Sequence, residues 1–131
     1  MRAFRGHCYA AARAVGGAVL GFEDPYRHTN NFAAGILRLG DGPVAVLLNA
    51  HFPLVGFAHP PAVDELELRF VDAAALVEAF RGFGGYQVLD RAALEQRLTP
   101  DAVADLDKGE RAEFTYWRPT RIGDVVFNSW D

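Results

Sequence analysis

Four short apolar segments between residues 32 and 71 constrain what this chain can fold into more than any other feature of its sequence. The links between them are only a few residues long. Parallel strands need crossover connections of a dozen or more residues, whereas antiparallel strands can follow one another through tight turns. The pattern therefore predicts an antiparallel meander of four or more strands. The expected strands cover residues 32–39, 44–49, 52–58 and 65–71.

Local signals within this region agree with a meander. Residues 40–43 read Gly-Asp-Gly-Pro, which is the chemistry expected of a turn between two antiparallel strands. The last segment alternates between apolar and charged residues, as a strand buried on one face should. Its apolar residues are Leu66, Leu68 and Phe70, and its charged residues are Glu65, Glu67 and Arg69.

Helical patterns flank the predicted sheet on both sides. Residues 7–15 are rich in good helix formers and stop at a pair of glycines. Asp72 and Asp90 each precede an amphipathic stretch, so both are expected to act as N-caps. The expected helices after the sheet cover residues 73–81, 91–98, 102–108 and part of 120–130, and short strands are expected at 18–22 and 86–89.

These elements predict an α+β fold in which the sheet of residues 32–71 carries an N-terminal helix and C-terminal helices packed on it. The chain has 131 residues, of which 50% are hydrophobic, so it can bury one sizeable core. An intrinsically disordered chain would have far fewer apolar residues. We therefore expect a single domain that spans residues 1–131.

Charge and apolar patterning narrow the classes of partner. The formal net charge is −4, so the chain offers no general electrostatic attraction for nucleic acid or for an acidic membrane surface. No apolar run approaches the roughly 20 residues that span a bilayer. Arg13 interrupts the apolar stretch near the N-terminus, which disfavours a cleaved secretion signal. We expect a cytoplasmic protein that is monomeric or forms a weak homodimer.

Cys8 is the only cysteine, so an intramolecular disulfide cannot form. A catalytic thiol would need a base such as histidine, and His7, its neighbour in a helix, would point about 100° away. Free cysteine is also among the most buried residue types. We therefore expect Cys8 to belong to the core and keep a Cys8-dependent enzyme as the less favoured alternative.

The sequence presents no pattern that identifies a catalytic, cofactor-binding or metal-ligating residue. The four histidines show no spacing typical of a metal site. Asn30, Asn31, Asn49 and His51 lie beside apolar strands, where they could line a pocket or equally shape turns. Acidic residues gather at 64–67 and 101–110, which indicates a solvated face or a surface that mates with a basic partner.

Two segments resemble small bacterial immunity proteins, the partners encoded beside polymorphic or contact-delivered toxins. The first is W-x-P-x-x-I-G-D-V-V-F-N-x-W-D at residues 117–131. The second is Leu-Leu-Asn-Ala-His-Phe-Pro at residues 47–53, followed by Val-Gly-Phe-Ala at 55–58. The resemblance implies a small α+β protein that binds and blocks its cognate toxin, for instance a nuclease or an NAD-consuming enzyme, without activity or cofactor of its own.

Contact residues for such a partner are expected on the charged strand face, on the acidic helix and in the C-terminal segment. Tyr, Trp and Arg dominate the energetics of many interfaces, although the C-terminal aromatics could equally cap the core. The expected partner-binding residues are Glu65, Glu67, Arg69, Asp101, Asp105, Tyr116, Trp117 and Arg118. The alternative to a toxin inhibitor is a protein that holds a small ligand in a pocket between sheet and helix.

Overall fold

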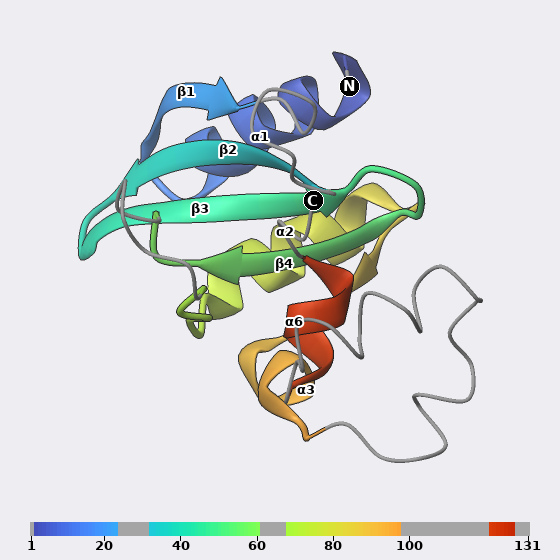
Figure 1. The fold of residues 1–131 in the computed structure, drawn as a ribbon. Helices are drawn as coiled ribbons and strands as arrows, with labels where there is room; N and C mark the ends of the chain where they lie inside the picture. The colour runs from blue at the N-terminus through green and yellow to red at the C-terminus, as the bar shows by residue number, and fades with distance from the viewer. Residues whose placement is uncertain (1, 24–31, 61–67, 98–120, 128–131) are drawn as a thin grey trace.

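A five-stranded sheet with helices on its two faces forms the framework of the protein (Figure 1). The computed structural model describes residues 2–23, 32–60, 68–97 and 121–127. The strands are β1 (Ala18–Glu23), β2 (Phe32–Leu39), β3 (Gly42–Asn49), β4 (Leu54–Ala58) and β5 (Gln87–Val88). The helices are α1 (Arg2–Ala14), α2 (Ala74–Phe83), α3 (Arg91–Glu95) and α6 (Ile122–Val126).

The strand order β1-β2-β3-β4-β5 follows the chain, and the first four strands are antiparallel neighbours. This confirms the predicted α+β meander, which begins one strand earlier than residue 32 because β1 pairs with β2. The hairpin between β2 and β3 closes where Leu39 pairs with Gly42. After α2 the chain returns to the sheet, and β5 pairs with β4 in parallel.

The strand expected at residues 65–71 falls partly outside the described residues. Within residues 68–71 the chain runs beside β4 and forms one isolated bridge, between Phe70 and Ala58. Two backbone hydrogen bonds support it, from His59 N to Arg69 O at 2.9 Å and from Val71 N to Phe57 O at 3.0 Å. Phe70 is buried and Arg69 is exposed, as the alternating pattern predicted for these two residues.

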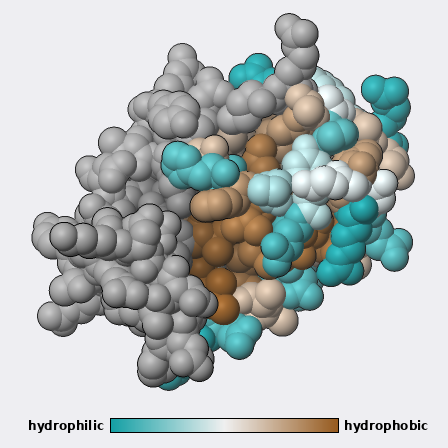
Figure 2. All heavy atoms as spheres, turned by 90° about the vertical axis from the view of Figure 1, so that its right-hand side faces the viewer, coloured by the Kyte–Doolittle hydropathy of each residue, from teal (hydrophilic) through white to brown (hydrophobic). Residues whose placement is uncertain are grey.

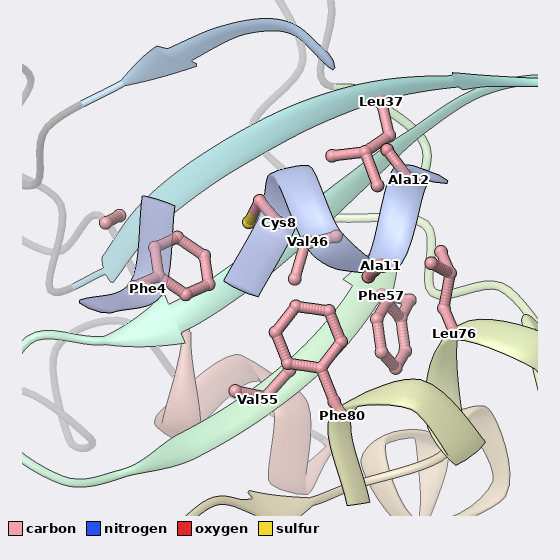
Figure 3. Close-up of a cluster of buried hydrophobic side chains, with 11 residues drawn as sticks. Phe4, Cys8, Ala11, Ala12, Leu37, Val46, Val55, Phe57, Leu76 and Phe80 are labelled. Atoms are coloured by element: carbon pink, nitrogen blue, oxygen red, sulfur yellow. The ribbon is translucent and has the colours of Figure 1, made fainter. Parts of the chain in front are cut away.

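Helices α1 and α2 cover one face of the sheet and bury the larger apolar cluster (Figures 1 and 3). Helix α1 presents a stripe of inward residues spaced at helical intervals, whose members are Phe4, Cys8, Ala11 and Ala12. Phe80 of α2 packs edge-on against Phe57 of β4, with ring centroids 5.9 Å apart. The stripe also explains why α1 begins at Arg2 rather than at residue 7, since Phe4 is buried in this cluster.

The opposite face of the sheet carries α3, α6 and the extended residues 68–71 over a second cluster. Phe127, directly after α6, lies edge-on to Phe32 of β2, and Leu94 of α3 is fully buried beside them. Because β3 and β4 are covered on both faces, their sequences read as nearly continuous apolar runs. None of the helices in the described segments is long and apolar enough to span a bilayer.

Only one of the two expected N-caps, Asp90, caps its helix in the structure. Asp90 accepts a hydrogen bond from the backbone N–H of Ala93 at 2.9 Å and caps α3, as predicted. Asp72 does not cap α2, because the helix begins one residue later, after Ala73. Its carboxylate lies 3.5 Å from the guanidinium of Arg91 instead. Helix α3 ends at Glu95 rather than residue 98, because Arg97 leaves the helix to form a bridge with Arg121.

Gly56 lets α3 and α6 approach the sheet closely. A Cβ atom at this position would lie 2.8 Å from both Leu94 Cδ1 and Phe127 Cε2. We predict that Gly56→Ala lowers the free energy of unfolding by about 1–3 kcal/mol, the usual cost of overpacking a core. Urea denaturation measures it. The control is Gly40→Ala, where no atom lies within 4 Å; equal losses in the two variants would contradict the prediction.

Candidate functional site

Of the eight residues predicted to bind a partner, the structure describes Arg69. It is exposed on the extended stretch beside β4. The other seven, which are Glu65, Glu67, Asp101, Asp105, Tyr116, Trp117 and Arg118, lie outside the described residues. The expected helix at residues 102–108 also lies there, as do Asn30 and Asn31.

Arg69 lines an open pocket of about 570 Å³ between the extended stretch, α3 and α6. The described residues that line it include three arginines, two carboxylates and three apolar side chains. Both signs of charge therefore meet in one concave surface. The lining residues within the described segments are His59, Leu68, Arg69, Phe70, Val71, Asp72, Arg91, Glu95 and Arg121.

Arg121 is held firmly in the wall of this pocket. Its Nη2 donates to Asp124 Oδ1 at 2.7 Å and to the backbone carbonyl of Leu68 at 3.0 Å. Its guanidinium carbon stands 4.8 Å from the centroid of the Phe70 ring, a distance suited to a cation–π contact. The side chain is only 17% exposed. Arg121 therefore ties α6 to residues 68–70 and has a structural role.

Arg91 makes weaker contacts at the mouth of the pocket. Its guanidinium lies 3.3 Å from Glu95 and 3.5 Å from Asp72, and its side chain is 48% exposed. Exposed ion pairs of this kind contribute little to stability, because water and salt screen them. Arg91 can therefore exchange its partners at little cost, whereas Arg121 cannot.

Cys8 lies in the apolar core, as predicted, and has no exposed surface (Figure 3). Its sulfur packs against β2 so closely that a Cβ atom on Gly35 would lie 2.9 Å from it. Burial raises the pKa of the Cys8 thiol to about 12. A nucleophilic cysteine needs the opposite, a lowered pKa and access to solvent. The geometry therefore argues against the Cys8-dependent enzyme.

His7 contacts Phe83, the last residue of α2, and Tyr86, which lies between α2 and β5. Its Nδ1 lies 2.6 Å from the hydroxyl of Tyr86, and its ring stacks on Phe83 with centroids 4.4 Å apart. Burial is the main cause that raises the pKa of the Tyr86 hydroxyl, and repulsion from the Cys8 thiolate is the second cause. The hydroxyl therefore stays protonated and available to His7. The stacking of His7 on Phe83 joins α1 to α2. No pattern in the neighbouring sequence predicted this contact.

The turn between β3 and β4 displays an exposed aromatic residue on a rigid support. Asn49 is 8% exposed, and its Oδ1 accepts hydrogen bonds from His51 N at 2.8 Å and Phe52 N at 3.0 Å. Its Nδ2 donates to the carbonyl of Val126 in α6 at 2.7 Å. Asn49 thus shapes the turn, which was one of the two roles considered for it. Phe52 is 61% exposed at the tip.

The sequence pattern placed Phe52 in the third predicted strand, residues 52–58. The structure instead begins β4 at Leu54 and leaves Phe52 exposed in the preceding turn. Asn49 could have indicated this turn, because an Asn side chain commonly accepts hydrogen bonds from backbone N–H groups two and three residues later. Here those groups belong to His51 and Phe52. Among the described residues, no group of three or more His, Cys, Asp or Glu side chains is arranged to hold a metal ion. Comparisons of the chain with protein families, with curated proteins and with solved structures find no match.

Burial predicts that Cys8 is unreactive in the folded protein. At neutral pH the raised pKa lowers the thiolate fraction about a thousandfold relative to an ordinary cysteine, and packing blocks access. We expect slow labelling by a disulfide reagent in buffer and rapid labelling in denaturant. The buried thiol should also stabilise the fold fully below pH 9, and this stabilisation should fall as the pH rises toward 12. Rapid labelling of the folded protein would contradict this.

Arg91 and Arg121 should differ in how much they contribute to stability. We predict that Arg121→Ala lowers the free energy of unfolding by about 2 kcal/mol, because it removes the guanidinium that donates to Asp124 Oδ1 and to the Leu68 carbonyl. Arg91→Ala should cost less than about 1 kcal/mol. Denaturant unfolding of both variants measures the difference, and a larger loss for Arg91→Ala would disprove the assignment.

Proposed function

We propose that this chain is an immunity-type protein, which neutralises a cognate bacterial toxin in the cytoplasm by direct binding and without catalysis of its own. The observation that carries the proposal is Phe52, displayed at the tip of a turn that the buried Asn49 holds with two hydrogen bonds. Both residues belong to the segment 47–53 that resembles immunity proteins.

A rigid exposed aromatic side chain is well suited to protein recognition. Large aromatic residues supply much of the binding energy at interfaces. A side chain whose support is already ordered also loses less conformational freedom on binding. Hydrogen bonds to Asn49 fix the backbone at His51 and Phe52, and the carbonyl of Phe52 accepts from Leu54 N at 2.8 Å. The turn therefore holds the backbone that carries the exposed Phe52 side chain.

The surface around this end of the sheet supports the same use. The β3–β4 turn is the green connection at the right of Figure 1, and Figure 2 views the molecule from that side. Apolar surface gathers in the middle of this view, with hydrophilic side chains along its right-hand rim. Apolar surface beside hydrophilic side chains is compatible with a protein interface, whose buried core is more apolar than its rim.

Arg69 and the seven other residues predicted from the sequence stay part of the proposed contact surface. Arg69 lies beside the end of β4, and Phe52 lies before its beginning. A strand of five residues is about 16 Å long, whereas a contact area of about 800 Å² per partner is roughly 30 Å across. One interface of ordinary size can therefore include both Phe52 and Arg69.

Toxicity rescue tests the proposal directly. The C-terminal domain encoded immediately upstream is expressed in a bacterial host with and without this protein. If the domain kills alone and cells survive with co-expression, the proposal is supported and the complex can be purified for mapping. A neighbouring domain that is harmless, or that kills regardless of co-expression, contradicts this pairing.

Phe52→Ala separates binding from stability. We expect at least a 30-fold loss of affinity for the neutralised toxin, as for other hot-spot residues, with a change in unfolding free energy below about 0.5 kcal/mol because the ring is exposed. Calorimetric titration and urea denaturation measure the two quantities. His51→Ala, in the same turn, should retain affinity, since His51 contributes its backbone N–H to the turn. Unchanged affinity in Phe52→Ala would remove Phe52 from the interface.

The pocket beside Arg69 favours a second candidate, a protein that binds a small ligand. Its volume of about 570 Å³ lies within the range of ligand sites, although it is open and its walls carry both signs of charge. Native mass spectrometry after gentle purification tests this function. A bound mass that is lost on denaturation would favour it, and a spectrum of the chain alone would count against it.

A further inference from the structure

The outer edge of β1 is a second surface with the features of a binding site. β1 is the first strand in the sheet order, so no described strand pairs with it on the side away from β2 (Figure 1). An edge strand directs backbone N–H and C=O groups outward, and these can pair with an extended segment of another protein. Exposed apolar side chains accompany this edge, namely Tyr9 at 52% and Leu20 at 58% exposure.

One stripe of α1 runs along this edge. Arg5, Tyr9 and Arg13 are four residues apart, so they share one face of the helix, and all three are exposed. Tyr9 packs against Phe22 of β1 with ring centroids 5.8 Å apart, and the guanidinium of Arg5 lies 5.1 Å from the centroid of the same ring. The stripe therefore borders β1 and would flank any strand added beside it.

The charge of this region is opposite to that of the rest of the chain. Residues 1–23, which end with β1, contain three arginines and one acidic residue, Glu23 at the end of the strand, which gives a formal charge of +2. The other 16 acidic residues come later, together with the other ten basic residues, so residues 24–131 carry −6 and the whole chain −4. The stripe is thus a basic surface on an acidic protein. Complementary charge attracts an acidic segment and disfavours a basic one.

We infer that the β1 edge and the Arg5–Tyr9–Arg13 stripe bind an extended, acidic segment of a partner protein. The spacing of the stripe specifies the segment further. Arg5 and Arg13 are eight helical residues apart, or about 12 Å, and two strand residues four positions apart are separated by about 13 Å on the same face. The matching segment has the pattern acidic-x-apolar-x-acidic, with its central apolar residue against Tyr9.

The bulge in β1 makes this edge selective. The pairing of β1 with β2 shifts register between Val19 and Gly21, and the extra residue is the exposed Leu20. Bulges twist an edge and discourage indiscriminate strand pairing. A bound segment therefore needs side-chain contacts as well as backbone hydrogen bonds. Symmetric pairing with a second copy is disfavoured too, because it brings two sets of arginines together.

Two heptapeptides test the inference on the full chain, independently of any toxin. The probe is Thr-Glu-Thr-Val-Thr-Glu-Thr and its counterpart carries Lys in place of both Glu residues, each with blocked ends. We expect the acidic peptide to bind about tenfold more tightly at an ionic strength of about 10 mM. The preference should disappear near 1 M, where charges are screened beyond about 3 Å. Amide NMR shifts and slowed hydrogen exchange should map to residues 18–23.

A charge-reversed variant makes the test decisive. In Arg5→Glu/Arg13→Glu the preference should switch to the lysine peptide, since both positions are exposed and the backbone edge is unchanged. The control is Arg81→Glu/Arg97→Glu, which alters two exposed arginines elsewhere and changes the net charge equally; it should keep the preference for the acidic peptide.

Three results would overturn the inference. One is equal binding of the two peptides by the native protein at low ionic strength. Another is a set of NMR shifts that leaves residues 18–23 unaffected. The third is a symmetric dimer in sedimentation equilibrium whose β1 amides are already protected, because a second copy would then be the occupant of this edge. Failure of the toxin rescue would leave all of these measurements unaffected.

Discussion

The buried amide of Asn49 is the interaction on which much of this structure depends. It lies at the end of β3 and makes three hydrogen bonds, two that shape the following turn and one that holds the last turn of α6. An unsatisfied amide at this depth would cost the fold a few kcal/mol. Asn49 therefore links the strand, the turn and the C-terminal helix. The same side chain that stabilises the sheet also sets the position of the exposed Phe52.

Because both faces of the central strands are buried, side chains that could bind a partner lie outside these strands. β3 and β4 are covered by α1 and α2 on one side and by α3 and α6 on the other, so their side chains serve the core. Exposed apolar groups of the described chain therefore lie at the periphery, at Tyr9, Leu20 and Phe52. Binding to either the β3–β4 turn or the β1 edge would leave the core intact. The two surfaces lie at different places on the sheet, so they can contact different partner segments.

Elements with a strong local signal were predictable, and elements decided by long-range contacts were not. The hairpin between β2 and β3 and the cap at Asp90 follow from turn and capping chemistry within a few residues, although the turn is shorter than predicted because Gly42 and Pro43 already pair with β2. Asp72 looked like an equally good cap, but the Arg91 guanidinium, 19 positions later in the chain, lies beside its carboxylate. Arg121 gave no signal for its role, because Leu68 and Phe70, which it contacts, are about 50 residues away.

By itself the sequence determined the α+β class, the antiparallel order of the central strands and the burial of Cys8, because periodicity, short links and side-chain chemistry act locally. Only the tertiary structure decided that β5 returns in parallel beside β4, that Asn49 is shared between a turn and α6, and that Phe52 stands in solvent while Phe57 is buried five residues later. The physical reason is that exposure and hydrogen-bond partners depend on which segments meet in space, and residues far apart in the chain supply those segments.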